Sequence, residues 1–229
     1  RKVAVIGCGF VGSSSAFALM QSGLFSEMVL IDADTNRAEG EAMDISHGIS
    51  FARPMQIYAG SYDDIADAAI IVITAGANQK PGETRLDLIK KNAAIMKSIV
   101  GEIKKRDFGG ILLIVSNPVD ILTLIALKES GYPANRVIGS GTVLDTGRFK
   151  YLLGEHLAID SRSVHAFIIG EHGDSEVAAW SITNIAGMSM KSFFEHYGKC
   201  TDEDLQAMYS EVKNSAYEII QKKVQPTTQ

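Results

Sequence analysis

Short apolar runs alternate with longer amphipathic segments along the first 140 residues of the chain. The apolar runs cover residues 3–6, 28–32, 70–74, 111–116 and 137–140. Nearly continuous apolar runs of this length are typical of parallel strands that are covered on both faces. The segments 11–23, 37–47, 86–106 and 119–130 lie between them and have the apolar spacing of helices. Strands that alternate with helices predict an α/β fold with a doubly wound parallel sheet.

The pattern changes after residue 140. We expect a helix over residues 143–156, strand-like stretches at 164–169 and 177–185, and a second helix at 204–222. Two glycines, Gly139 and Gly141, mark the change. The sequence therefore predicts two domains, residues 1–140 with the doubly wound sheet and residues 141–229 with a smaller α+β arrangement.

The composition excludes several classes of protein. The 229 residues are 46% hydrophobic and 21% charged, with a net charge of −5 and no run of basic residues, so nucleic acid is not an expected partner. The two cysteines, Cys8 and Cys200, form no CxxC motif, which argues against a zinc site and for a reducing compartment. No apolar run reaches the roughly 20 residues of a membrane span. We also see no signal peptide before the first strand, and a cytoplasmic protein is expected.

A glycine-rich loop, Gly-Cys-Gly-Phe-Val-Gly, occupies residues 7–12 between the first predicted strand and the first helix. In a dinucleotide-binding unit Gly7 permits the tight turn, Gly9 lets a pyrophosphate approach, and Gly12 lets the helix pack on the strand. Asp32 ends the second strand, where its carboxylate would bind ribose hydroxyls and repel a 2′-phosphate. The motif predicts NAD as the cofactor. The alternative is a glycine-rich turn without a ligand, and in either case Cys8 is only a small residue of the loop.

One His, one Asp and one Arg of the second domain are candidates for chemistry. His172 lies between Glu171 and Gly173 directly after a predicted strand, and an imidazole can give and take the proton that accompanies hydride transfer. Asp145 could orient it, and Arg148 could bind a carboxylate with two parallel hydrogen bonds. The alternatives are a structural His172 and a surface ion pair between Asp145 and Arg148, which are three residues apart on one predicted helix.

Two segments of the first domain follow predicted strands. Residues 75–85 contain Gly and Pro and are expected to form a loop, which could close over a substrate or be an ordinary surface connection. Asn117 precedes Pro118 after the strand at 111–116, at the end of the sheet where open α/β sheets bind ligands.

Together these motifs resemble the lactate and malate dehydrogenase superfamily, and most closely its bacterial L-lactate dehydrogenases, from residue 1 to about Lys223. The resemblance implies reversible hydride transfer between NADH and pyruvate to give L-lactate, without a metal. It implies that NAD contacts Gly7, Gly9, Phe10, Val11, Gly12, Asp32, Thr74, Ala75, Gly76 and Asn117.

The resemblance also implies a role for each candidate. His172 corresponds to the proton donor to the substrate carbonyl, Asp145 to the carboxylate that orients it, and Arg148 to the clamp on the substrate carboxylate. Arg85 corresponds to a loop residue that polarises the carbonyl, and Asn117 to a residue that places the substrate and the nicotinamide.

The resemblance places substrate choice at Gln79. Similar malate dehydrogenases have an Arg there, which pairs with the second carboxylate of oxaloacetate. A neutral Gln79 leaves that charge unpaired in a closed site, which costs several kcal/mol, so pyruvate is the expected substrate. The alternatives are a malate or other 2-hydroxy acid dehydrogenase, or a truncated NAD-binding protein without turnover.

Two further expectations come from the resemblance alone. Similar chains continue well past Lys223, so the second domain is expected to be incomplete relative to the family. Similar enzymes form homotetramers, and some are activated by fructose 1,6-bisphosphate at a subunit interface. Lys150 and His165 stand at the positions of the residues that bind this activator, with Lys150 in place of the usual Arg.

Overall fold

The computed structural model describes residues 1–77, 82–198 and 201–224. The chain divides into two compact units, Arg1–Ser140 and Gly141–Gln229. Each unit is described by itself below.

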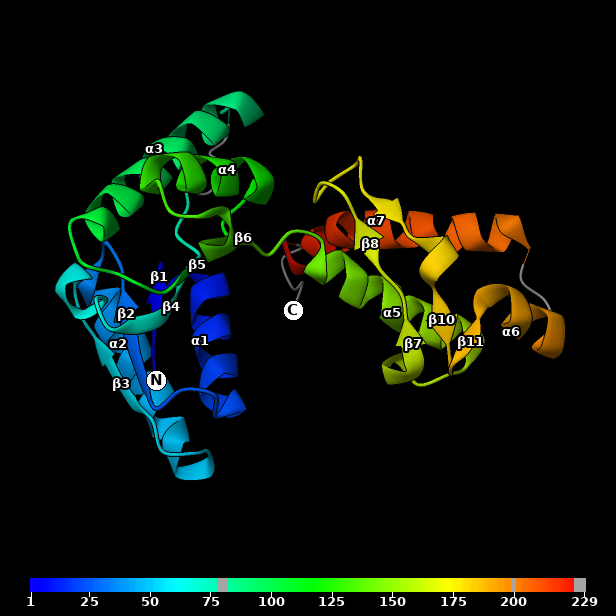
Figure 1. Ribbon diagram of the computed structural model, residues 1–229, viewed down its shortest axis with the longest axis horizontal. Coiled ribbons are helices and arrows are strands. Elements are labelled where there is room, and N and C mark those ends of the chain that lie inside the picture. Colours follow the sequence, from blue (N-terminus) through cyan, green and yellow to red (C-terminus); the bar gives the residue numbers. More distant parts are fainter. Residues whose placement is uncertain (78–81, 199–200, 225–229) are drawn as a thin grey trace, which may run out of the picture. The chain divides into compact units, whose positions relative to one another are not determined.

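The described part of the first unit is a parallel sheet with helices on both faces (Figure 1). Its elements are β1 (Lys2–Ile6), α1 (Phe10–Ser22), β2 (Glu27–Ile31), α2 (Thr35–His47), β3 (Gln56–Ala59), β4 (Ala68–Ile73), α3 (Arg85–Lys104), β5 (Ile111–Ile114), α4 (Val119–Ser130) and β6 (Val137–Gly139). The strand order is β3-β2-β1-β4-β5-β6 and every pair is parallel. This order confirms the predicted doubly wound α/β fold.

The pleat of the strands divides the core of the first unit between two faces. Along β1, Val3 and Val5 pack in a cluster with apolar residues of α1 and α2. Their neighbours Ala4 and Ile6 point the other way and pack in a cluster with apolar residues of α3 and α4. Since side chains alternate along a strand, a strand covered on both faces must be apolar throughout, which is why these runs were visible in the sequence.

The edge strand β3 was not predicted. It has four residues, Gln56-Ile-Tyr-Ala59, none of which is fully buried. It pairs with β2 on one side only. A short strand at a sheet edge buries little, so it carries neither a continuous apolar run nor a clear alternation.

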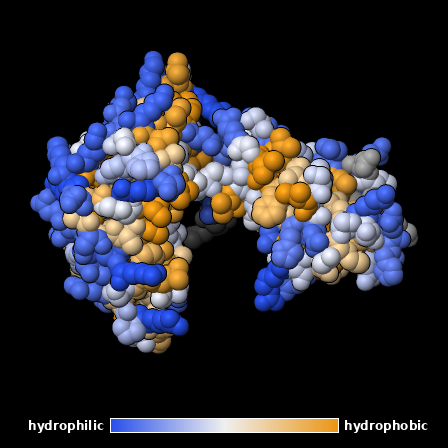
Figure 2. All heavy atoms as spheres, in the orientation of Figure 1, coloured by the Kyte–Doolittle hydropathy of each residue, from blue (hydrophilic) through white to orange (hydrophobic). Residues whose placement is uncertain are grey.

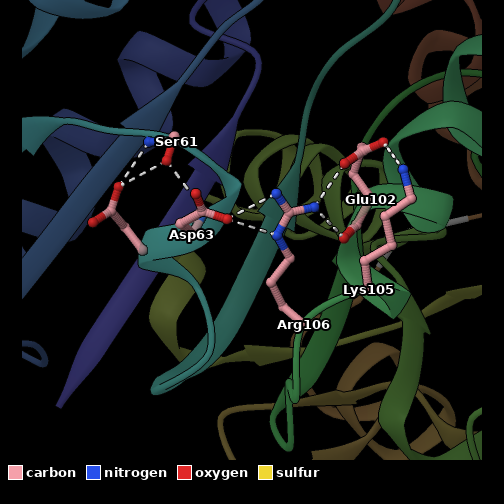
Figure 3. A network of polar contacts seen from close by, with 6 residues as sticks. Ser61, Asp63, Glu102, Lys105 and Arg106 are labelled. Carbon is pink, nitrogen blue, oxygen red and sulfur yellow. Dashed lines mark hydrogen bonds and ion pairs between the residues drawn. The ribbon is translucent and has the colours of Figure 1, made fainter.

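A network of charged side chains fastens the end of α3 to the short 3₁₀ turn η2 (Tyr62–Asp64) that follows β3 (Figure 3). Arg106 Nη2 lies 2.8 Å from Asp63 Oδ1, and its Nη1 lies 2.6 Å from Glu102 Oε2. Lys105 Nζ contacts the other oxygen of Glu102 at 2.5 Å. Most of these groups are exposed to solvent, which screens their charges, so the network serves mainly to fix local geometry.

The second unit is built from short strands and three helices in its described residues. Its elements are α5 (Val143–Leu157), β7 (Val164–His165), β8 (Ile168–Ile169), β9 (Val177–Ala178), β10 (Asn184–Ile185), β11 (Met188–Ser189), α6 (Met190–Tyr197) and α7 (Asp202–Val224). The strands form two antiparallel sheets, β11-β10-β7 and β8-β9. The second unit also has the 3₁₀ turns η4 (Ser161–Ser163) and η5 (Trp180–Ile182), and the first unit has η1 (Gly48–Phe51) and η3 (Ala134–Arg136).

Three details of the second unit differ from the sequence-based expectation. The stretch 164–169 is two strands, β7 and β8, that belong to different sheets. The stretch 177–185 is likewise divided into β9, η5 and β10. Helix α6 was not predicted, because its eight residues are too few for a clear helical period.

The core of the second unit lies between α5, α7 and the short strands. Phe149 and Leu153 of α5 and Val212 of α7 are buried in one cluster. The ring of Phe149 meets that of Trp180 edge to face, with centroids 4.9 Å apart. This packing holds α5 in place, and α5 carries three of the candidate residues, Asp145, Arg148 and Lys150.

Apolar residues also reach the surface of each unit, as Figure 2 shows for the visible face. Phe10 is 94% exposed and Phe51 89% exposed in the first unit, and Val143 is 72% exposed in the second. Among the described helices, none has the combination of length and apolar character that crossing a bilayer requires.

Candidate active site

A cavity of about 870 Å³ lies at the carboxyl ends of β1, β2 and β4 in the first unit. Open parallel sheets bind nucleotides at this edge. The lining includes eight of the ten residues predicted to hold a dinucleotide. They are Gly7, Gly9, Phe10, Val11, Asp32, Thr74, Ala75 and Gly76, whereas Gly12 is not part of the lining.

The glycine loop has the shape that a dinucleotide needs. Gly7 adopts φ +101°, and a Cβ there would lie 2.5 Å from the backbone nitrogen of Ala75. A Cβ on Gly12 would lie 1.8 Å from the carbonyl oxygen of Gly7, so only glycine lets α1 pack this close to the loop. At Gly9, by contrast, a Cβ would meet nothing within 4 Å. That open space at the start of α1 is where a phosphate can approach the free N–H groups of the helix.

Asp32 is tied to the loop through its carboxylate. Its Oδ2 accepts a hydrogen bond of 2.6 Å from the backbone N–H of Cys8, and its Oδ1 accepts one of 2.9 Å from the N–H of Asp34. The Cys8 side chain is buried, and burial together with the charge of Asp32 raises the pKa of its thiol to about 12. Cys8 therefore contributes its backbone and stays a neutral thiol. The residues present fit an NAD molecule, with Asp32 at the ribose position.

Asn92 joins the loops that follow β4 and β5, and sequence reasoning missed it. Its Oδ1 accepts a hydrogen bond of 2.8 Å from the N–H of Ala77, and its Nδ2 donates one of 3.0 Å to the carbonyl oxygen of Asn117. Asn92 is buried in the middle of α3. A polar residue at an apolar position of an amphipathic helix is the signal that could have pointed to it.

The other candidates of the first unit are placed as follows. Arg85 is the exposed first residue of α3, behind a capping box in which the Thr84 hydroxyl accepts from the N–H of Asp87 at 3.1 Å. Asn117 is exposed and precedes Pro118 through a cis peptide bond. Asn117 is not among the residues that line the cavity. Gln79 lies outside the described residues.

In the second unit one carboxylate binds both of the other candidates. Asp145 Oδ2 lies 2.5 Å from His172 Nδ1, and its Oδ1 accepts a hydrogen bond of 3.1 Å from Arg148 Nη1. Asp145 is buried on the first turn of α5. Its contacts with an imidazole and a guanidinium supply the partners that a buried carboxylate requires.

The contact between Asp145 and His172, 27 residues apart, depends on how α5 is fastened to β8. Thr146 Oγ1 accepts from the backbone N–H of Ile168 at 2.9 Å and lies 3.3 Å from its carbonyl oxygen. Thr142 Oγ1 donates to the same carbonyl at 2.6 Å. These hydroxyl groups hold the strand that precedes His172 against the turn of helix that carries Asp145.

Helix α7 contacts the loop between β8 and β9 at the end of the loop that leads into β9. Lys213 Nζ donates a hydrogen bond of 2.7 Å to the carbonyl oxygen of Asp174, and the Tyr209 hydroxyl donates to the carbonyl oxygen of Glu176. The loop that carries His172 is therefore anchored at α5 and at α7. Neither Thr146 nor the residues of α7 stood out in the sequence, because their partners are backbone groups distant in the chain.

A further ionisable side chain, Glu176, lies close to Asp145 and His172. One polar atom each of Asp145, His172 and Glu176 lies within 4.8 Å of the others. We interpret the cluster as one that shares protons, because the 2.5 Å between Asp145 and His172 leaves no room for an ion between them. Burial, and then the charge of Asp145, raise the pKa of the Glu176 carboxyl.

The residues predicted to bind an activator both lie in the second unit. Lys150 is half-buried on α5, and His165 is exposed on β7. Helix α5 packs against β7. The exposed His165 differs from His172, because only 25% of the His172 side chain is exposed.

The first unit has a doubly wound sheet with a nucleotide-binding glycine loop, and the second holds an imidazole on a buried carboxylate. These two features define a two-domain NAD-dependent oxidoreductase. Residues 1–139 match the NAD binding domain of the lactate/malate dehydrogenases, and residues 142–229 match their alpha/beta C-terminal domain. The chain belongs to the lactate/malate dehydrogenase family.

Similar proteins with curated names include L-lactate dehydrogenases. The chain is 56% identical over 224 residues to that of Acetivibrio thermocellus and 57% identical over 223 residues to L-lactate dehydrogenase 1 of Clostridium acetobutylicum. Both matches cover 97% of this chain and 71% of the relative. A solved structure of the minor L-lactate dehydrogenase of Enterococcus mundtii, in its ligands-bound form, superposes with a TM-score of 0.94 at 48% identity, again over 97% of this chain and 71% of that one.

Proposed function

We propose that this protein catalyses the reversible NAD-dependent interconversion of pyruvate and L-lactate. Curated relatives at 53–57% identity that carry the name L-lactate dehydrogenase support the reaction. The observation that carries the proposal is the single carboxylate of Asp145, which holds an imidazole on one oxygen and a guanidinium on the other. A proton donor and an anion-binding group side by side suit a substrate that has a carbonyl next to a carboxylate.

The side chains of this protein would supply the acid–base part of the reaction. When bound, nicotinamide dinucleotide supplies the redox chemistry by hydride transfer. In the direction of reduction, His172 gives a proton to the carbonyl oxygen of pyruvate, so that the ketone becomes an alcohol and no alkoxide is left. Asp145 holds Nδ1 of the imidazole and stabilises its protonated form before the transfer. In the reverse direction the same imidazole takes the proton from the lactate hydroxyl.

Arg148 would bind the substrate carboxylate. Its hydrogen bond to Asp145 uses Nη1, whereas a guanidinium has five N–H donors. A carboxylate can therefore dock on the same side chain while Asp145 keeps it in place. Arg85 would polarise the carbonyl from the start of α3, and Gln79 would disfavour a second carboxylate on the substrate.

A direct assay separates this function from its alternatives. The purified protein is mixed with NADH and either pyruvate or oxaloacetate, and NADH oxidation is followed by absorbance. We expect turnover with pyruvate and a strong preference for it over oxaloacetate. A preference for oxaloacetate would instead identify a malate dehydrogenase. Binding of NADH, seen by fluorescence, without turnover of either substrate would identify a non-catalytic nucleotide-binding protein.

We also propose that the protein works as a homotetramer whose copies bind fructose 1,6-bisphosphate through Lys150 and His165. Phe51 of the first unit and Val143 of the second are 89% and 72% exposed, and association of copies would cover such apolar side chains. Light scattering after size exclusion gives the oligomeric state. A pyruvate saturation curve that does not change when the bisphosphate is added would exclude the activator site.

A further inference from the structure

Glu176 is a buried carboxyl group that the proposed reaction does not use. It precedes β9, and only 5% of the residue is exposed. Within the described residues, its Oε1 has no hydrogen-bond partner. An ionised carboxylate with an unpaired buried oxygen is costly, whereas a protonated carboxyl group carries no charge and has a proton to donate.

The surroundings of Glu176 favour the protonated form. Asp145 of α5 is the carboxylate that faces it, and His172 lies in the same cluster. Lys213 and Tyr209 approach from α7, but they bind backbone carbonyl oxygens, Lys213 that of Asp174 and Tyr209 that of Glu176 itself.

Together, burial and the neighbouring charges raise the pKa of Glu176. Burial and the charge of Asp145 raise the pKa of Glu176, and a side-chain hydrogen bond to Asp145 raises it further. The cations His172 and Lys213 act in the opposite direction but do not reverse the shift. Of two neighbouring carboxyl groups, the one that already accepts from an imidazole and a guanidinium keeps its charge, and the other keeps the proton.

We propose that Glu176 is a positioning residue that keeps its proton and donates a hydrogen bond to Asp145, and that it thereby limits how tightly the Asp145–His172 pair holds its own proton. The role in catalysis rests on the proposed lactate dehydrogenase function. The protonation of Glu176 does not, because it follows from the folded second unit alone.

The proposed hydrogen bond affects His172 through Asp145. A neutral donor on Asp145 takes up part of its negative charge, so the imidazolium is stabilised less than it would be by an isolated carboxylate. His172 then releases its proton to a substrate more readily. An ionised Glu176 would have the opposite effect, because a second negative charge would hold the proton on the imidazole.

The test compares Glu176→Gln, which keeps a neutral donor, with Glu176→Leu, which removes it. Glu171→Gln is the matched control, because Glu171 lies in the same loop but is exposed. Infrared difference spectra at neutral pH, without substrate or cofactor, should show the C=O stretch of a protonated carboxyl in the wild type and in Glu171→Gln. Both Glu176 variants should lack it.

The second readout is the titration midpoint of His172, followed by the NMR signal of its ring proton. Glu176→Leu should move this midpoint upward by about half a unit to one unit. Glu176→Gln should restore most of the wild-type value, which a merely structural role would not predict.

Two results would overturn the proposal. One is the absence of the protonated-carboxyl band in the wild type, which the comparison with Glu176→Gln decides even if Glu176→Leu does not fold. The other is a His172 midpoint that is equal or lower in Glu176→Leu. Neither readout involves pyruvate, so a protein that shows the band and the shift but has no lactate dehydrogenase activity would disprove only the proposed function.

Discussion

Replacing Asp145 by Asn tests the link between the carboxylate and the proton donor. The side chain keeps its shape and can still accept a hydrogen bond from His172, but it loses its charge. In the wild type Asp145 Oδ2 lies 2.5 Å from His172 Nδ1, and the Asp145 side chain is only 5% exposed. Loss of the charge therefore removes the stabilisation of the protonated imidazole in a site with little access to water.

The size of the effect follows from the charge separation. Two unit charges with centres about 4 Å apart interact by about 4 kcal/mol at an effective dielectric constant of 20. The His172 side chain is 25% exposed, and solvent screens part of this energy. We therefore expect a loss of about 2–4 kcal/mol, which corresponds to a decrease of roughly 30-fold to 1000-fold in kcat for pyruvate reduction. KM for pyruvate should change less, because Arg148 is still present.

The assay is steady-state NADH oxidation with pyruvate, run on Asp145→Asn and on a control that removes one negative charge from the same helix. Glu155→Gln is suitable, since Glu155 is exposed and lies ten residues further along α5. At that distance, about 15 Å along a helix, salt screens its charge and kcat should stay within about twofold of the wild type. A kcat for Asp145→Asn within about threefold of the wild type would refute the reasoning, because Asp145 would then not stabilise the proton on His172.

Four further predictions concern other parts of the molecule. Gly9→Ala should weaken NADH binding in a fluorescence titration and leave thermal stability nearly unchanged, since the new Cβ would meet no protein atom within 4 Å. Gly12→Ala should weaken NADH binding and also lower the free energy of unfolding by about 1–3 kcal/mol, since its Cβ would lie 1.8 Å from a backbone oxygen. Gln79→Arg should shift the ratio of kcat/KM toward oxaloacetate, and a persistent strong preference for pyruvate would contradict the assigned basis of specificity. Asn92→Leu should lower the free energy of unfolding in urea by about 2–4 kcal/mol, because two backbone groups lose their partner, and a loss under about 0.5 kcal/mol would show that water replaces it. The raised pKa of Glu176 means that the folded protein binds this proton more tightly than the unfolded chain does. The free energy of unfolding should therefore fall as the pH rises from about 4.5 through the folded-state pKa. Glu176→Gln should remove this part of the pH dependence in urea titrations.

The central part of the fold could be predicted because each signal is local. The strands β1, β2, β4 and β5 are covered on both faces, so their sequences are apolar throughout, and the glycine loop is contiguous between a strand and a helix. The edge strand β3 and the helix α6 bury too little over too few residues to produce such a pattern. The two-residue strands of the second unit are defined by their partners rather than by their own sequence.

The candidate site was predictable residue by residue but not as a geometry. His172, Asp145 and Arg148 were chosen for their chemistry, whereas their contact depends on Thr146, which fixes β8 to α5 by hydrogen bonds to the backbone. Glu176 gave no signal, because a Glu in a loop is normally exposed and only the fold shows that this one is buried. Tertiary contacts of this kind are not encoded in any short segment of sequence.

The two hydrogen bonds of Asp32 have a consequence for attempts to redesign cofactor preference. A substitution meant to admit a 2′-phosphate, such as Asp32→Ser or Asp32→Ala, removes a negative charge and also removes the acceptor for the N–H groups of Cys8 and Asp34. The glycine loop would lose the hydrogen bond that fixes its backbone at the same time as it had to bind a new ligand. The affinity for either dinucleotide would therefore fall. A successful switch therefore requires a second change, near the start of α2, that supplies a new acceptor for the Cys8 N–H together with a cation for the phosphate.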